Sequence, residues 1–212
     1  MFIFCIVGKT GSGKSKFVNS IINDIDFCNK YNIKPLVYCT TRQKRSGELE
    51  GIDYHFISPE DFDKEIPNII ECRSYDTKDN GNVNYFTRMQ DINKDANLIC
   101  AASPEQVINY IEAFSADSSI NLRILYLDVP VSIRMKRVIN YRTKTDEMAL
   151  ELCRRILAES EEFKKLDSVI ENGSVVFYKF DNSVNVNSDQ DNETFEDIRR
   201  LISSLIITNN EK

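Results

Sequence analysis

The first residues whose types and spacing could do chemistry form a glycine-rich run near the N-terminus. The run is Gly8-Lys9-Thr10-Gly11-Ser12-Gly13-Lys14-Ser15, which matches G-x-x-x-x-G-K-[ST] at every fixed position. Gly8, Gly11 and Gly13 allow backbone angles that turn successive amide N–H groups toward one anion. Lys14 adds a positive charge for the terminal phosphates, and the Ser15 hydroxyl can bind Mg²⁺. The run therefore predicts a site for the phosphates of a nucleotide.

The flanks of the run are those that such a loop requires. Residues 2–7 are continuously apolar, which is typical of a strand buried on both faces of a parallel sheet. After the loop, apolar residues recur at helical spacing from residue 17 to residue 25. A helix that begins near Gly13 directs its positive dipole end at the phosphates. The alternative, a chance turn rich in Gly and Ser, does not account for both flanks.

Basic residues are gathered into three groups, although the net charge of the chain is −6. One group flanks the glycine-rich loop, a second contains Arg42, Lys44 and Arg45, and a third lies between residues 134 and 155. An acidic chain with three cationic groups favours a small polyanionic ligand. The same charge balance argues against a general nucleic-acid-binding protein.

The second basic group belongs to a longer pattern. Residues 40–58 read TTRQKRSGELEGIDYHFIS, which resembles the signature of guanylate kinases. Together with the loop, the resemblance covers most of the chain and is strongest over residues 1–90. It implies that Arg42, Arg45 and Tyr54 hold the phosphate of an acceptor nucleotide. Guanidinium and phenol groups suit this role, because they donate to several phosphate oxygens at once. A solvated loop without a partner is the alternative.

The resemblance also implies contacts to the acceptor base. Glu71 would accept hydrogen bonds from N1 and N2 of guanine, Tyr85 would contact the phosphate, and Thr87 would reach the base. For Glu71, a solvent-facing position on a strand is the alternative.

Four positions depart from the family pattern. Tyr38 stands where the resembling enzymes carry a Ser that helps to read guanine, and Phe86 stands where they carry Gly. Ala101 and Ser103 fall near the places of two carboxylates. We retain Tyr38 and Ser103 as substrate-binding candidates. An enzyme rejects a wrong base because that base leaves polar groups of the site unpaired. These four changes therefore leave the identity of the acceptor base undetermined, but they affect the predicted reaction class less.

The third basic group lies on two stretches with helical patterns, residues 132–141 and 146–166. This region resembles the mobile lid of the kinases, whose arginines fold over the phosphates. Arg137, Arg142 and Arg155 match best, and a surface helix with scattered ion pairs is the alternative.

Two further residues near the last expected strands are candidates for binding the donor nucleotide or its metal. In the family an Asn after a strand lies near the donor adenine, which makes Asn172 a candidate within a strand expected over residues 169–179. Asp128 ends an apolar strand and is a minor candidate for supporting the metal; capping of the next helix is the alternative. We interpret His55 as a packing residue.

Strands and helices alternate along the chain, which predicts an α/β fold with a parallel sheet between helical layers. The resemblance to guanylate kinases implies that this fold is a P-loop NTPase core with two insertions. Core strands are expected over residues 2–7, 34–39, 97–103 and 122–127. The expected division is a core of residues 1–37, 91–132 and 161–212, a segment of residues 38–90 that binds the nucleoside monophosphate (GMP), and a helical lid of residues 133–160.

Composition places further bounds on the protein. The 212 residues are 42% hydrophobic and 28% charged, as in an ordinary globular domain. The six cysteines show no metal-ligand spacing, which favours reduced thiols in the cytoplasm. Apolar runs are shorter than a membrane span or a signal-peptide core, so we expect a cytoplasmic protein without a membrane partner.

These observations predict a nucleoside monophosphate kinase that transfers the γ-phosphate of MgATP to GMP or dGMP. Lys14 and the lid arginines would neutralise developing charge, and Arg42 would bridge donor and acceptor. The alternatives are a catalytically inactive guanylate-kinase-like binding module, a kinase with altered base specificity, and a P-loop GTPase. The GTPase is weakened because N-K-x-D and D-x-x-G runs are missing. Expected partners are ATP and the acceptor nucleotide, with no nucleic acid, and the chain is expected to be a monomer or homodimer.

Overall fold

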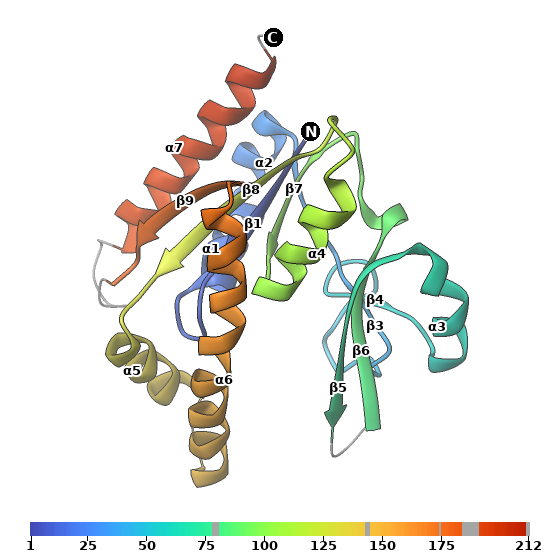
Figure 1. The fold of residues 1–212 in the computed structure, drawn as a ribbon, viewed down its shortest axis with the longest axis vertical. Helices are drawn as coiled ribbons and strands as arrows, with labels where there is room; N and C mark the ends of the chain where they lie inside the picture. The colour runs from blue at the N-terminus through green and yellow to red at the C-terminus, as the bar shows by residue number, and fades with distance from the viewer. Residues whose placement is uncertain (78–80, 143–144, 174, 184–190, 211–212) are drawn as a thin grey trace.

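The computed structural model describes residues 1–77, 81–142, 145–173, 175–183 and 191–210 (Figure 1). These residues form a larger parallel sheet covered by helices and a smaller mixed sheet beside it. Among the helices of this described part, none is long and apolar enough to cross a membrane.

The larger sheet positions the glycine-rich loop. Its strand order is β2-β7-β1-β8-β9, and every neighbouring pair runs parallel. All six residues of β1 are buried, as its apolar run predicts. Parallel strands end at one edge of a sheet, and ligands of such folds bind at that edge, where the connections diverge to opposite sides. The strands are β1 (Phe2–Val7), β2 (Ile33–Pro35), β7 (Asn97–Ala101), β8 (Asn121–Asp128) and β9 (Val176–Asp181).

Helices cover both faces of this sheet (Figure 1). Ile3 and Cys5 of β1 enter an apolar cluster that includes side chains of α4 and α6. Phe4 and Ile6 point to the other face and pack with α1 and α7. The structure thus confirms the predicted three-layer α/β core. The helices are α1 (Lys14–Ile22), α2 (Ile25–Tyr31), α4 (Pro104–Phe114), α6 (Asp146–Glu171) and α7 (Asp191–Asn210).

The predicted strand over residues 34–39 is wrong as a single element. β2 ends at Pro35, and Cys39 begins β3, which belongs to the smaller sheet. Residues 36–38 pass from one sheet to the other: the Leu36 amide still donates to Ile99 of β7 at 3.0 Å, whereas the Tyr38 carbonyl already accepts from the amide of His55 at 2.8 Å. An apolar run alone does not reveal such a change of sheet.

The smaller sheet has the order β4-β3-β6-β5. β3 pairs with β4 in parallel, and the other pairs are antiparallel. Its outer side packs on α3, where the rings of Phe62 and Phe86 lie 5.2 Å apart. Its elements are β3 (Cys39–Thr40), β4 (His55–Phe56), α3 (Pro59–Glu65), β5 (Ile69–Thr77) and β6 (Gly81–Arg88), with short 3₁₀ helices at Ile66–Asn68 and Met89–Asp91.

Two helices follow β8 in the region of the expected lid. α5 (Val131–Arg142) and the first half of α6 extend beyond the edge of the larger sheet (Figure 1). α6 continues without interruption through residue 160, and Phe163 and Leu166 on its second half are buried in the core. The expected strand over residues 169–179 is therefore wrong in its first part: α6 ends at Glu171, and β9 begins at Val176.

Candidate nucleotide-binding site

The glycine-rich loop joins the carboxyl end of β1 to the start of α1. Gly11 and Gly13 adopt φ angles of 81° and 101°, in the left-handed region that favours glycine. A Cβ atom at Gly11 would lie 2.7 Å from the carbonyl oxygen of Arg134, and one at Gly8 would lie 2.8 Å from that of Leu127. The loop therefore needs these glycines for both conformation and space, as expected of a loop whose amides turn inward.

The loop forms one wall of a pocket of about 650 Å³. The second wall comes from the smaller sheet and the start of α4, and the third comes from α6. Of the predicted site residues, nine line this pocket: Gly8, Thr10, Lys14, Ser15, Tyr38, Tyr54, Tyr85, Ser103 and Arg155. The structure thus brings the predicted phosphate loop and two predicted acceptor-site tyrosines to one cavity.

Lys14 and Ser15 stand at the N-terminus of α1, inside this pocket. The Lys14 ammonium group donates a hydrogen bond to the Gly8 carbonyl, so it lies over the loop. Ser12 is fully buried, and its hydroxyl oxygen has no hydrogen-bond partner among the described residues. Such an unsatisfied polar atom in a loop of inward-facing amides fits a site that is completed by an anion.

Arg42 lies behind the pocket wall and is held in a fixed orientation. Two of its nitrogens donate to the two carboxylate oxygens of Glu48, at 3.0 and 2.8 Å. Its Nε donates to the hydroxyl of Tyr85 at 3.2 Å, and its guanidinium lies over the ring of Tyr54. The hydrogen bonds from Arg42, followed by the one from the Arg45 amide, lower the pKa of Glu48 to about 2. Arg42 therefore contacts both tyrosines that line the pocket.

Arg45 occupies the same loop but is exposed. Its amide donates to Glu48 at 2.7 Å, whereas its side chain is outside the pocket lining. Arg45 can thus approach an acceptor phosphate only from the solvent side.

Glu71 and Thr87 lie beneath the pocket rather than on its surface. The side chain of Glu71 is 0% exposed. Its Oε1 accepts hydrogen bonds from Thr87 Oγ1 at 2.9 Å and from Gln106 Nε2 at 3.0 Å. Its Oε2 accepts from Arg73 Nε at 3.2 Å. The alternative prediction, that Glu71 faces solvent, is therefore wrong. Its contacts with Gln106 and Arg73 were not predicted from the sequence.

The departures from the family pattern gather at this end of the pocket. Tyr38 is a pocket-lining residue whose hydroxyl donates to the carbonyl of Ala101 at 3.0 Å. Ser103 is the N-cap of α4: its hydroxyl accepts from the amide of Gln106, and Gln106 Oε1 accepts from the amide of Ser103. The sequence S-P-E-Q could have revealed this capping box. Phe86 is fully buried in the smaller sheet.

The predicted lid arginines have different surroundings. Arg137 donates to the carbonyls of Gly11 and Asn182, at 3.4 and 2.7 Å, so it is attached to the loop. Arg155 is exposed and lines the pocket beside Arg154. Arg142 is the last residue of α5, and its side chain lies outside the described residues.

A carboxylate on α6 joins this helix to the loop. Glu159 accepts hydrogen bonds from the backbone amide of Thr10, at 2.8 Å, and from its hydroxyl. Arg134 of α5 lies 3.4 Å from the other carboxylate oxygen of Glu159 and donates to the Thr10 carbonyl at 2.9 Å. Arg134 belongs to the third basic group, but its contact with Glu159 was not predicted, and neither was the contact between Glu159 and Thr10, which lie 149 positions apart in the chain.

Asn172, a predicted site residue, and Asn182 have different surroundings. Asn172 caps the C-terminus of α6 and lies outside the pocket lining. Asn182 directly follows β9, is 2% exposed, and donates from Nδ2 to the carbonyl of Ser12 at 2.8 Å. The expected strand over residues 169–179 starts several residues before β9, and Asn182 is the first Asn after β9.

Asp128 ends β8, as predicted, and its carboxylate pairs with Lys179 on β9 at 2.8 Å. Among the described residues, no group of three or more His, Cys, Asp and Glu side chains could hold a metal by itself. A Mg²⁺ ion at this site would therefore depend on Ser15 and on nucleotide phosphates, which is how proteins commonly bind it.

The parallel sheet, the glycine-rich loop at its carboxyl edge and the pocket beside it define a P-loop nucleotide-binding protein. The sequence model of the family described as guanylate kinase matches residues 2–202. The chain belongs to the guanylate kinase family, and its class is that of the nucleoside monophosphate kinases.

Individual relatives agree with this family. The chain is 26% identical over 178 residues to a guanylate kinase of Malacoplasma penetrans, an alignment that covers 80% of this chain and 84% of the relative. It is 39% identical over 64 residues to one of Sulfurimonas denitrificans, but this covers 30% of the chain and 29% of that protein. The crystal structure of guanylate kinase from Anaplasma phagocytophilum shares the fold, with a TM-score of 0.54 and 18% identity, covering 100% of this chain and 87% of that one.

Proposed function

We propose that this protein transfers the γ-phosphate of ATP to GMP or dGMP, giving ADP and the corresponding diphosphate. One observation supports this proposal above the others. A single pocket is lined by Lys14 and Ser15 of the phosphate loop and by Tyr54 and Tyr85, both of which contact Arg42. Donor and acceptor phosphates could therefore meet without passing through solvent.

At the donor end, the loop amides and Lys14 would bind the β- and γ-phosphates of ATP. Asn182 and Arg137 hold loop carbonyls, so they keep the loop in the shape that presents its amides. Ser15 would hold Mg²⁺ through its hydroxyl. The ion, when bound, neutralises charge on the phosphate oxygens.

At the acceptor end, Tyr54 and Tyr85 would contact the monophosphate, with Arg42 and Arg45 supplying positive charge. The Arg42–Glu48 pair keeps the guanidinium oriented before substrate arrives. Preorganisation of this kind lowers the barrier, because the group need not reorient as charge develops. Phosphoryl transfer depends mainly on such positioning and charge stabilisation.

The lid would complete the site. Arg155 and Arg142 would close over the phosphates and exclude water that would otherwise hydrolyse ATP. Arg137 would join them only by releasing the Gly11 and Asn182 carbonyls that it holds in this structure. The division into core, acceptor segment and lid is part of this proposal.

A coupled assay of ADP release tests the proposal. The protein is supplied with MgATP and, one at a time, each ribo- and deoxyribonucleoside monophosphate. We expect ADP only when both MgATP and a guanine monophosphate are present. If no monophosphate stimulates ADP release, the proposal fails and the binding-module alternative replaces it.

A kinase with a different acceptor base is the second candidate. The contacts of Glu71 favour this candidate, because its carboxylate is buried and already accepts hydrogen bonds from three side chains. The carboxylate is therefore not exposed to accept from N1 and N2 of guanine. The same panel separates the two candidates, because a preferred base other than guanine would identify the second.

A further inference from the structure

The base end of the pocket presents a cation to the ligand. Arg73 lines the pocket and its side chain is 16% exposed, whereas its partner Glu71 is 0% exposed and lies beneath the lining. A base that enters the pocket therefore meets hydrogen-bond donors before it can meet a carboxylate.

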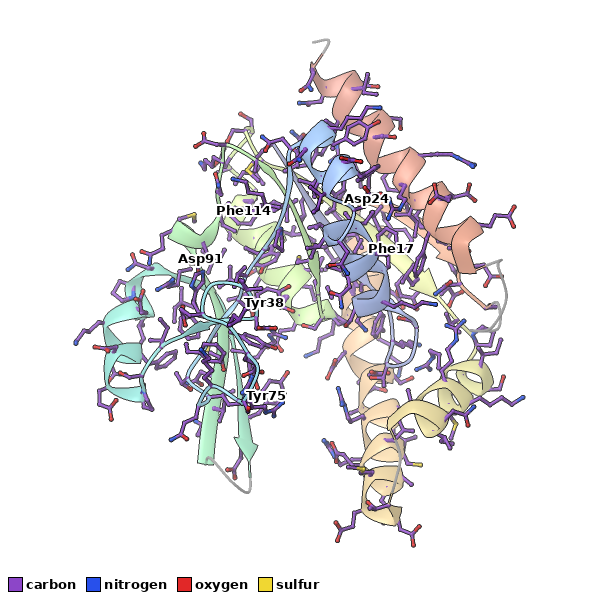
Figure 2. The ribbon with its side chains drawn as sticks, turned by 180° about the vertical axis from the view of Figure 1, so that it is seen from behind. Phe17, Asp24, Tyr38, Tyr75, Asp91 and Phe114 are labelled. Carbon is purple, nitrogen blue, oxygen red and sulfur yellow. The ribbon has the colours of Figure 1, made fainter. Side chains whose placement is uncertain are left out.

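The orientation of Arg73 is fixed by its neighbours. Its Nε donates to Glu71 Oε2 at 3.2 Å, and its guanidinium carbon lies 5.9 Å from the centre of the Tyr38 ring. Tyr38 is itself held by the Ala101 carbonyl. Tyr38 and Tyr75 lie on the side of the smaller sheet that faces the core, and both line the pocket (Figure 2). With Nε engaged by Glu71, the two terminal nitrogens form the fork that is left for a ligand.

A guanidinium fork is complementary to two adjacent acceptors. Guanine offers O6 and N7 side by side, whereas adenine offers N7 next to a donating N6 amino group. In uracil an N3–H donor separates the two carbonyl acceptors, whereas cytosine offers N3 and O2 side by side. Between the two purines, guanine therefore suits this fork better than adenine.

We propose that Arg73 is a specificity-determining residue that reads O6 and N7 of the guanine ring, with Glu71 as its positioning residue. This inference rests on the proposed function, which it deepens by naming the base edge that is read. It differs from the contact implied by the family resemblance, in which Glu71 accepts from N1 and N2.

Base analogues distinguish the two edges without any mutation. Binding of GMP, inosine monophosphate, 7-deaza-GMP and AMP is measured by calorimetry, and kcat/KM is measured for each. Inosine monophosphate lacks only the 2-amino group, so we expect it to match GMP closely. The 7-deaza analogue and AMP disrupt the O6 and N7 pair, and we expect each to be weaker by about 10- to 100-fold. If inosine monophosphate is the weak ligand and 7-deaza-GMP equals GMP, Glu71 reads the other edge and the inference is wrong.

Variants locate the effect on Arg73. We expect Arg73→Met to reduce the preference for GMP over AMP by about 10- to 100-fold. Arg73→Lys keeps a charge beside Glu71 but lacks the fork, so we expect it to fold and yet not to restore the preference. Arg200→Met, an exposed arginine on α7, is the matched control and should leave the preference unchanged.

The outcomes separate this inference from the proposed function. Phosphorylation of GMP with an unchanged preference in Arg73→Lys overturns the inference and leaves the kinase proposal intact. Failure of every monophosphate to bind overturns both.

Discussion

At the scale of single residues, the proposed chemistry depends on groups held in place before substrate arrives. Lys14 lies over the phosphate loop, and Arg42 is fixed by Glu48 and Tyr85. Both side chains would act through charge, which is worth most where water is excluded.

Lys14→Met tests the donor side. The substitution keeps an unbranched side chain that is one atom shorter and removes its charge, so we expect turnover to fall by at least about 100-fold. The midpoint of thermal unfolding should change little. Lys16→Met, two residues along the same helix on its exposed surface, is the control and should retain activity. Equal activity of the two variants would contradict the role given to Lys14.

Glu48→Gln tests the acceptor side through acid stability. Because folding lowers the pKa of Glu48 to about 2, its ionised form stabilises the folded state. That stabilisation is fully present above the unfolded pKa of about 4.3 and is lost as the pH falls toward about 2. Urea unfolding should therefore show wild type more stable than Glu48→Gln at neutral pH, with a difference that shrinks across this window. A difference that stays constant down to acid pH would mean that the Arg42 pair does not depend on the charge of Glu48.

At the scale of elements, the phosphate loop is the most constrained segment. Gly11 and Gly47 both have positive φ angles, 81° and 90°, but their surroundings differ. A Cβ at Gly11 would approach the backbone of Arg134, whereas one at Gly47 would meet nothing within 4 Å.

The two glycines give a matched pair of variants. Gly47→Ala should cost only the left-handed conformation, about 1 kcal/mol of the free energy of unfolding. Gly11→Ala adds displacement of α5 from the loop, and we expect a total loss of about 2 kcal/mol or more. Urea unfolding measures both. Equal losses would show that α5 does not press on the loop.

Elements with a strong local signal could be predicted from the sequence. The octet, the buried strand before it and the start of the helix after it follow from short-range patterns, and the structure has them where expected. The helical pattern expected through residue 25 is wrong at its end, because α1 stops at Ile22 and Ile25 begins α2. The passage of the chain between two sheets after Pro35 has no such signal, because it depends on which distant strand pairs with each segment. The end of α6 and the start of β9 were also misplaced, because the sequence of residues 169–175 does not mark where the helix stops. As a result Asn182, and not Asn172, is the first Asn after β9.

The base pocket was the least predictable part of the site. Glu71 was found through the family signature, but its burial by Thr87, Gln106 and Arg73 arises from three separate elements. The contacts of Glu71 with Thr87 and Gln106, like the one between Glu159 and Thr10, join residues far apart in the sequence and require the folded chain.

At the scale of the whole molecule, the pocket is assembled from the core, the smaller sheet and α6. A ligand that reaches both ends should therefore bind more tightly than either nucleotide alone, because the second contact becomes intramolecular.

A bisubstrate analogue tests this arrangement. An adenosine and a guanosine joined by five phosphates, present at about 100 times its Kd, should add about 2.7 kcal/mol to the free energy of unfolding. Its Kd should be lower than that of ATP or GMP by at least about 100-fold. Arg42→Met should remove most of this advantage. An analogue that binds no better than ATP would indicate that the two ends are not used together.

The central claim, direct passage of phosphate between two nucleotides, is tested most directly with ATP labelled on its γ-phosphate. The protein is incubated with labelled MgATP and GMP, and the products are separated by chromatography. We expect the label to move into GDP, with release as inorganic phosphate far slower. Label that appears only as inorganic phosphate, at the same rate with and without any monophosphate, would contradict it.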